Sequence, residues 1–202
     1  MTIVEDRPVA GGHAAARKAM LDSQLRTSGV SAGYVLARMG EVAREDFAPV
    51  SARGVAYMDR AIALDNGGFL AAPLVQGMML QEAGPTMADK ALLVDGGSGY
   101  LAELVRPLVG SLEVVSAADA TVAKRKGGDF TLLLIDGAVE QLPVALVQRL
   151  AEGSRVVCGA LQNGLTRLAA GRKAGGEVAL LPLAEIGIPV LPEFAAQKEW
   201  SF

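Results

Sequence analysis

Cysteine and histidine are nearly absent from this chain: its 202 residues include one of each, Cys158 and His13. A single cysteine excludes a disulfide within the chain and suits a reducing compartment. One thiol and one imidazole, far apart in the sequence, do not supply the ligands of a metal site, so no metal is expected. His13 lies in a Gly/Ala-rich N-terminal stretch that we interpret as a mobile tail.

Long apolar runs and an excess of one charge are also missing. No apolar stretch approaches the roughly 18 residues that span a bilayer, and the first residues, MTIVEDRPVAGG, lack the basic start and apolar run of a signal peptide. We therefore predict a cytoplasmic protein without a membrane partner. The formal net charge is −3, and the only basic cluster, residues 124–126, is too short to indicate a nucleic-acid partner and is interpreted as a solvated loop.

Apolar side chains are abundant, at 51% of the residues, which is ample for a buried core. We expect one compact unit, with an N-terminal helical segment and loop at residues 1–72 and an α/β domain at residues 73–202. Apolar spacing predicts a helix over residues 14–27 and a second helix capped by Ser31. Residues 53–72 look irregular, and Pro73 is placed to begin a helix that ends before Gly84.

Alternating strands and helices in the centre of the chain predict a parallel sheet with helices on its faces. The expected strands are apolar runs at residues 91–95, 112–116, 131–136 and 155–159. Pro143 begins a helix that extends to about residue 150. After Gly164 the pattern changes, and residues 165–169 and 177–183 flank a glycine-rich turn, which predicts an antiparallel hairpin.

A glycine loop follows the first of these strands. The strand ends in Asp95, and Gly96, Gly97, Ser98 and Gly99 lead into a helix. Ligands bind beyond the carboxyl ends of parallel strands, where glycines let backbone N–H groups approach closely. The spacing is neither G-x-G-x-x-G nor that of a phosphate-binding P-loop. A tight strand-to-helix turn without a ligand uses similar residues, so this alternative stays open.

An acidic residue that grips ribose hydroxyls is expected about 20 residues after such a loop, at the end of the second strand. That place falls near Ser116 or Ala117, and neither is acidic. Asp119 can serve only if the end of the strand shifts by about two residues.

Several motifs, in this order and spacing, resemble the protein-L-isoaspartate O-methyltransferase family, in particular a divergent bacterial branch. They are MLDSQLR at 20–26, VLARM at 35–39, VAREDF at 42–47, YMDRAI at 57–62, LVDGGSGY at 93–100, IDGAVE at 135–140 followed by Pro143, and QKEW at 197–200. Together they cover most of the chain from about residue 16 onwards.

The resemblance implies a Rossmann-like class I methyltransferase sheet that transfers a methyl group from S-adenosylmethionine to the carboxylate of an isoaspartyl residue in a damaged protein or peptide. That carboxylate is already ionised at neutral pH, so orientation against the sulfonium methyl accounts for most of the rate. The implied cofactor-binding residues are Asp95, Gly96, Gly97, Ser98, Gly99, Asp119, Asp136 and Gly137. The implied substrate-binding residues are Leu70, Ala71 and Ala72.

Two substitutions depart from the family pattern. The family's substrate loop carries Thr-Ile-Ser-Ala/Gln-Pro, whose serine is thought to position the isoaspartyl group, and Ala71 stands at that serine's place. Losing one hydrogen bond to a charged group costs about 1.5–3 kcal/mol. The missing ribose acid costs a similar amount.

The third departure is an internal deletion. Relatives build a helix, a further strand and an adenine-contacting turn where this chain has only residues 120–130. A helix of about 11 residues and a strand of about 5 cannot fit there. We therefore expect the sheet to lose its outer strand, the cofactor pocket to lose half of its wall, and residues 112–116 to become an edge that a second copy can pair with. Whether another element compensates is left open.

These losses concern one ligand and roughly add, to more than about 5 kcal/mol, or over a thousandfold in affinity. The favoured hypothesis is therefore a methyltransferase-like protein with impaired or lost methyl transfer and a binding or scaffolding role. The alternatives are an active isoaspartyl methyltransferase, with Asp119 on the ribose, and a site for a different small ligand above Asp95 and Asp136. Either aspartate can also be a simple helix cap or solvated strand end.

Overall fold

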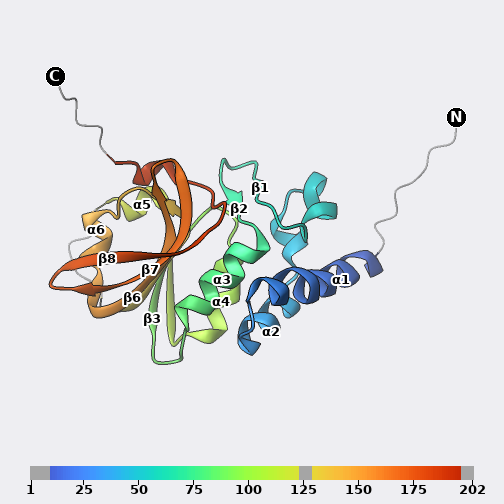
Figure 1. The fold of residues 1–202 in the computed structure, drawn as a ribbon, viewed down its shortest axis with the longest axis horizontal. Helices are drawn as coiled ribbons and strands as arrows, with labels where there is room; N and C mark the ends of the chain where they lie inside the picture. The colour runs from blue at the N-terminus through green and yellow to red at the C-terminus, as the bar shows by residue number, and fades with distance from the viewer. Residues whose placement is uncertain (1–9, 123–128, 197–202) are drawn as a thin grey trace, which may run out of the picture.

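A six-stranded sheet forms one half of the molecule in the computed structural model, which describes residues 10–122 and 129–196, and the N-terminal helices lie at the other end (Figure 1). The strand order is β4-β3-β5-β6-β7-β8. Its strands are β3 (Lys90–Asp95), β4 (Ser111–Ser116), β5 (Phe130–Val139), β6 (Leu150–Gln162), β7 (Leu165–Ala174) and β8 (Glu177–Glu185). The first four strands pair in parallel, and β6, β7 and β8 pair antiparallel. The predicted α/β sheet with its C-terminal hairpin is confirmed.

The strand β4 lies at the edge of this sheet, as the deletion predicts. Within the described ranges it pairs only with β3, from Lys90 opposite Ser111 to Asp95 opposite Ser116. The described residues therefore contain no outer strand beside β4, as expected from the short connection. Residues 123–128, which contain the basic cluster 124–126, and the motif at 197–200 lie outside the described residues.

The N-terminal helices differ in detail from the predictions. The first, α1 (Ala10–Ala19), continues as a π-helix (Met20–Leu25) and a 3-10 turn (Arg26–Ser28) that ends at the left-handed Gly29. His13 lies in this helix with Nδ1 3.4 Å from Oε1 of Glu45, so its assignment to a mobile tail is wrong. The second helix, α2 (Gly33–Glu41), has Ala32 at its N-cap. Ser31 is therefore not the cap, and its amide and that of Ala32 both donate to Oε1 of Gln81.

The segment expected to be irregular contains short regular elements. They are the 3-10 helices Arg44–Phe47 and Val50–Val55 and the two-stranded sheet β1 (Ile62–Ala63) and β2 (Phe69–Leu70). The helix α3 (Pro73–Ala83) then begins at Pro73 and ends at the left-handed Gly84, as predicted. Its buried side chains, among them Val75 and Met79, join the N-terminal helices and one face of the sheet in a common core.

The remaining helices are short and lie near the ends of the strands. They are α4 (Tyr100–Val105) with the 3-10 turn Arg106–Leu108, α5 (Ala117–Ala120), α6 (Val144–Val147) and the 3-10 turn η6 (Pro192–Phe194). The helix expected from Pro143 to residue 150 is shorter than predicted because Leu150 already begins β6 and pairs with Phe130. A second core, on the other face of the sheet, includes Leu133 and Phe194.

Candidate functional site

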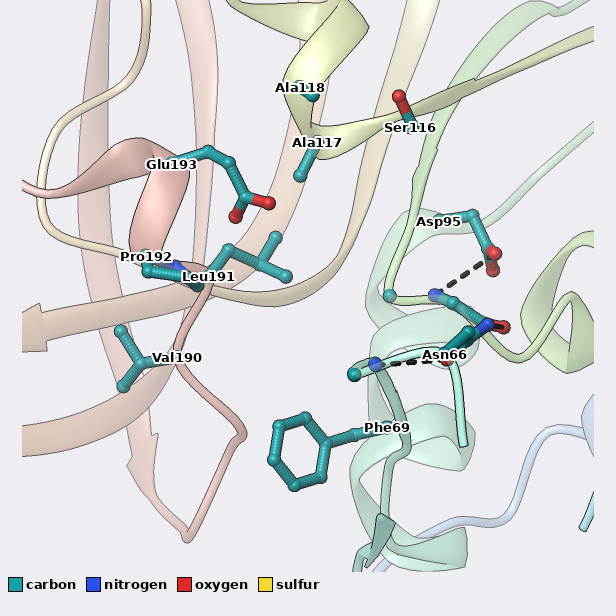
Figure 2. Close-up of a pocket in the computed structure, with 14 residues that line it drawn as sticks. Asn66, Phe69, Asp95, Ser116, Ala117, Ala118, Val190, Leu191, Pro192 and Glu193 are labelled. Carbon is teal, nitrogen blue, oxygen red and sulfur yellow. Dashed lines mark hydrogen bonds between the residues drawn. The ribbon is translucent and has the colours of Figure 1, made fainter. Parts of the chain in front are cut away.

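A pocket of about 280 Å³ lies at the carboxyl ends of β3 and β4, where the sequence predicts a ligand site (Figure 2). Four segments line it: residues 66–69 with β2, the glycine loop after β3, the first residues after β4, and a C-terminal segment at 190–193. The lining residues are Asn66, Gly67, Gly68, Phe69, Asp95, Gly96, Gly97, Ser116, Ala117, Ala118, Val190, Leu191, Pro192 and Glu193. The volume is just below the 300–1,000 Å³ range of small-molecule sites.

Asp95 organises the glycine loop. Its Oδ2 accepts a hydrogen bond from the amide of Gly97 at 3.0 Å, and its Oδ1 accepts one from Gly99 at 2.9 Å. Gly97 and Gly99 have φ values of 108° and 73°, a region that favours glycine. Ser98 accepts a hydrogen bond from the amide of Tyr100 at the start of α4. Asp95 thus binds amides within the glycine loop and does not cap α4, whose N-cap is Gly99, and it also lines the pocket.

The loop before β2 is bound directly to the glycine loop. Asn66 donates from Nδ2 to the carbonyl of Gly97 at 2.9 Å and accepts from the amide of Gly68. The amide of Phe69 donates to the carbonyl of Gly96 at 2.8 Å. Backbone lies so close at Gly68 that a Cβ there would overlap Gly96. These contacts fix one wall of the pocket and hold the ring of Phe69 on its border (Figure 2).

Asp119, the alternative candidate for binding ribose, forms hydrogen bonds with neighbouring Ser116 instead. Ser116 caps α5 by accepting from the amide of Asp119 at 3.1 Å, and it donates from Oγ to Oδ2 of Asp119 at 2.8 Å. Ser116, Ala117 and Ala118 line the pocket, and Asp119 does not. The end of β4 therefore brings no carboxylate into the pocket.

The C-terminal segment forms the wall opposite the glycine loop. Ala138 of β5 donates to the carbonyl of Pro189 at 2.7 Å, and its own carbonyl accepts from Leu191 at 2.9 Å. The buried side chain of Leu191 covers Gly137 so closely that a Cβ on Gly137 would lie 2.6 Å from Leu191 Cγ. Residues 190–193 form a wall of the pocket that the sequence did not predict. Sequence reasoning missed this contact because it joins segments about 50 residues apart.

Asp136 and Gly137 lie beneath these walls and do not line the pocket. Asp136 is buried, and its Oδ2 accepts a hydrogen bond from Nε2 of Gln76 at 2.9 Å, while its Oδ1 has no partner among the described residues. Burial, and then the nearby carboxylate of Asp95, raise the pKa of Asp136 to about 7. The hydrogen bond from Gln76 and the positive charge of Arg44 lower this pKa, by less than burial and Asp95 raise it.

Arg44 is the second residue that sequence reasoning missed. It is fully buried, and it donates from Nε to the carbonyl of Ala56 at 2.8 Å, from Nη1 to Oε1 of Gln76 at 2.6 Å, and from Nη2 to the carbonyl of Ala71. Its guanidinium carbon also lies 4.9 Å from the ring centre of Tyr100. Gln76, within an otherwise apolar stretch of α3, was the available signal of a buried polar network. Nothing in the sequence around Arg44 distinguishes it from a surface arginine.

Two kinds of feature are absent from the described part of the chain. In residues 10–122 and 129–196 no group of three or more His, Cys, Asp or Glu side chains is arranged to hold a metal ion. None of the helices there has the length and apolarity needed to cross a bilayer.

Comparison with known proteins identifies the family. The model of the protein-L-isoaspartate(D-aspartate) O-methyltransferase family matches residues 15–126, more than half of the sequence. The chain belongs to this family. The protein-L-isoaspartate O-methyltransferase of Koribacter versatilis is 29% identical over 191 residues. The match covers 83% of this chain and 86% of the relative's length.

Two solved structures share the fold. One, a protein-L-isoaspartate O-methyltransferase, superposes with a TM-score of 0.69 at 17% identity over 87% of this chain and 65% of its own length. The other is a Plasmodium falciparum protein described as a protein-L-isoaspartate O-methyltransferase in complex with S-adenosyl-L-homocysteine. It has a TM-score of 0.65 at 15% identity, and the match covers 90% of this chain and 99% of the other. The Rossmann-like methyltransferase fold is thus confirmed.

Residues 70–72, for which the resemblance implies substrate binding, are buried. Leu70, Ala71 and Ala72 are at most 7% exposed, and the carbonyl of Ala71 is bound to Arg44. The side chain at position 71 is a methyl group, so it offers no hydrogen-bond donor. The loop is therefore held in place by its backbone.

Proposed function

We propose that this family member binds S-adenosylmethionine weakly in the pocket between the glycine loop and residues 190–193, that its methyl transfer to isoaspartyl carboxylates is impaired, and that binding is its main role. When bound, S-adenosylmethionine supplies an activated methyl group on a sulfonium. Family membership and the position of the pocket beyond the ends of parallel strands support the binding part.

The residues present fit the cofactor in part. Two carboxylates, Asp95 and Glu193, line opposite walls of the pocket and suit the ammonium and the hydroxyl groups of such a ligand. Glycine backbone at positions 96 and 97 permits close approach. The small volume and the absence of an acid among Ser116, Ala117 and Ala118 favour weak binding.

The single observation that carries impaired transfer is the methyl side chain of Ala71, at the place of the family serine. Without a donor at this position, a substrate carboxylate loses one hydrogen bond to a charged group, or about 1.5–3 kcal/mol. If that bond tightens in the transition state, transfer slows by about ten- to a hundredfold. Asp136 is linked to Ala71 through hydrogen bonds of Gln76 and Arg44. It therefore adds an acidic group near the proposed site of the substrate carboxylate.

The experiment combines calorimetric titration with S-adenosylhomocysteine and methyl incorporation into an isoaspartyl peptide, with the Koribacter versatilis relative as reference. We expect a dissociation constant of hundreds of micromolar or weaker, and methyl incorporation at least about tenfold below the reference. Incorporation equal to the reference supports the alternative, an active isoaspartyl methyltransferase. Absence of binding at millimolar ligand rejects the cofactor and leaves the scaffolding role.

That scaffolding role has its own structural basis. Among the described residues the edge strand β4 pairs with β3 alone, and Val114 on it is 39% exposed. An open edge can pair with a strand of a second chain. We propose a second copy of this chain as the partner.

A further inference from the structure

We propose that Glu193 is the ribose-binding residue of this pocket and takes the place of the acid that is missing after β4. This inference rests on the proposed binding of S-adenosylmethionine. The glycine-loop pattern predicts a ribose-binding acid at the end of the second strand. This proposal instead assigns the ribose contact to the C-terminal turn η6.

The first argument is the position of the carboxylate. Glu193 lines the pocket together with Asp95, Ser116 and Ala117. Figure 2 shows its side chain directed into the pocket, beside Leu191 and towards Ala117. A ligand that lies along the glycine loop and reaches the end of β4 meets the carboxylate of Glu193 from the opposite wall.

The second argument is that the backbone on both sides of Glu193 is fixed. Leu191 is buried against Gly137, and Phe194 is only 2% exposed in the second core. The carbonyl of Phe194 accepts hydrogen bonds from the amides of Glu140 at 3.2 Å and Gln141 at 3.0 Å. A side chain mounted between two such anchors has little backbone freedom to lose when a ligand binds, which favours affinity.

The third argument is the availability of the group. No described residue donates a hydrogen bond to the Glu193 carboxylate, whereas Asp119 is bound to Ser116 and Asp95 to the amides of Gly97 and Gly99. A vicinal diol presents two O–H donors, and a carboxylate presents two acceptor oxygens. Of the two carboxylates that line the pocket, Asp95 binds two loop amides, whereas Glu193 accepts no hydrogen bond from any described residue.

The C-terminal segment also lies next to the shortened connection at residues 120–130. Residues 190–193 lie against the end of β5 and against α5, the short helix that leads into this connection. Closing this flank with the C-terminal segment brings an acidic residue to the pocket from a new direction.

The test measures ligand binding in the full chain. Calorimetric titration with S-adenosylhomocysteine compares the wild type with Glu193→Ala, Glu193→Gln and Asp119→Asn, and Glu177→Gln on β8 serves as a remote, exposed control. We expect binding to weaken about ten- to a hundredfold for Glu193→Ala and less for Glu193→Gln, and to stay unchanged for the other two. Because Glu193 is exposed, the melting temperatures should stay close to that of the wild type.

A second measurement identifies the diol as the contact. Ligand-observed NMR competition compares adenosine with 2′-deoxyadenosine, and the wild type should prefer adenosine whereas Glu193→Ala should not. If the wild type binds S-adenosylhomocysteine but Glu193→Ala binds it equally, or keeps the preference for adenosine, the inference is overturned and the cofactor proposal stands. If the wild type binds neither ligand, both fail.

Discussion

Gln76 donates a hydrogen bond from Nε2 to Oδ2 of Asp136 over 2.9 Å, and both side chains are buried. The contact joins α3 to β5, and the carbonyl oxygen of the same amide accepts from Arg44. One glutamine therefore links a buried acid to the arginine that holds the backbone of Ala71. Polar networks of this kind are costly when incomplete, so substitutions within it should have large effects.

Asp136 should make stability depend on pH. Its pKa is raised to about 7 in the folded protein, whereas an unfolded aspartate titrates near 3.9. Between these values the folded state binds more protons than the unfolded state, so stability falls as pH rises from about 4 to about 7. Asp136→Asn, which keeps the acceptor for Gln76, should remove this slope and stabilise the protein above pH 7 by up to about 4 kcal/mol.

Urea denaturation of both proteins at pH 5, 6, 7 and 8 measures this difference. Carboxylates with lowered pKa values, such as Asp89 and Asp129, titrate below this window and are common to both proteins. A gap in unfolding free energy that does not widen between pH 5 and 7 contradicts the prediction.

Arg44→Lys should destabilise the fold although it keeps the positive charge. Lysine cannot reproduce the fork that reaches Ala56, Gln76 and Ala71 at once, so buried acceptors lose their donors. We expect a loss of about 2–4 kcal/mol, or about 5–15 °C in melting temperature. Calorimetry provides the measurement, and Arg53→Lys, on an exposed residue of a neighbouring 3-10 helix, is the matched control. Equal melting temperatures for the two variants would show that the Arg44 network contributes little.

Ala71→Ser should increase methyl transfer to an isoaspartyl peptide by about tenfold if the missing hydroxyl is what limits the reaction. The gain should appear in kcat, with little change in the affinity for S-adenosylhomocysteine. Ala63→Ser, on the exposed face of β1, is the control because it adds the same hydroxyl outside the pocket lining and should have no such effect. Equal rates for wild type and Ala71→Ser would place the limitation elsewhere.

Val114→Lys should disperse any dimer that forms through β4. A lysine on an edge strand opposes pairing with a second strand, and Val114 is exposed, so folding should be unaffected. We expect light scattering to detect a dimer of the wild type and a monomer of the variant. A wild type that stays monomeric at tens of micromolar contradicts pairing through this edge.

Local sequence determined the elements and the glycine loop. Apolar runs produced the parallel strands because a strand buried on both faces has no polar side, and Pro73 and Gly84 bounded α3 by their backbone preferences. The shortened connection at 120–130 also predicted the edge position of β4, since a chain of that length cannot build a helix and a strand.

Only the tertiary structure decided what surrounds the loop. Leu191 reaches Gly137, Arg44 reaches Gln76, and Gln76 reaches Asp136, across sequence distances that no local pattern encodes. The wall at 190–193 exists because burying Leu191 and Phe194 removes apolar surface from water, and the whole fold determines where that surface is available.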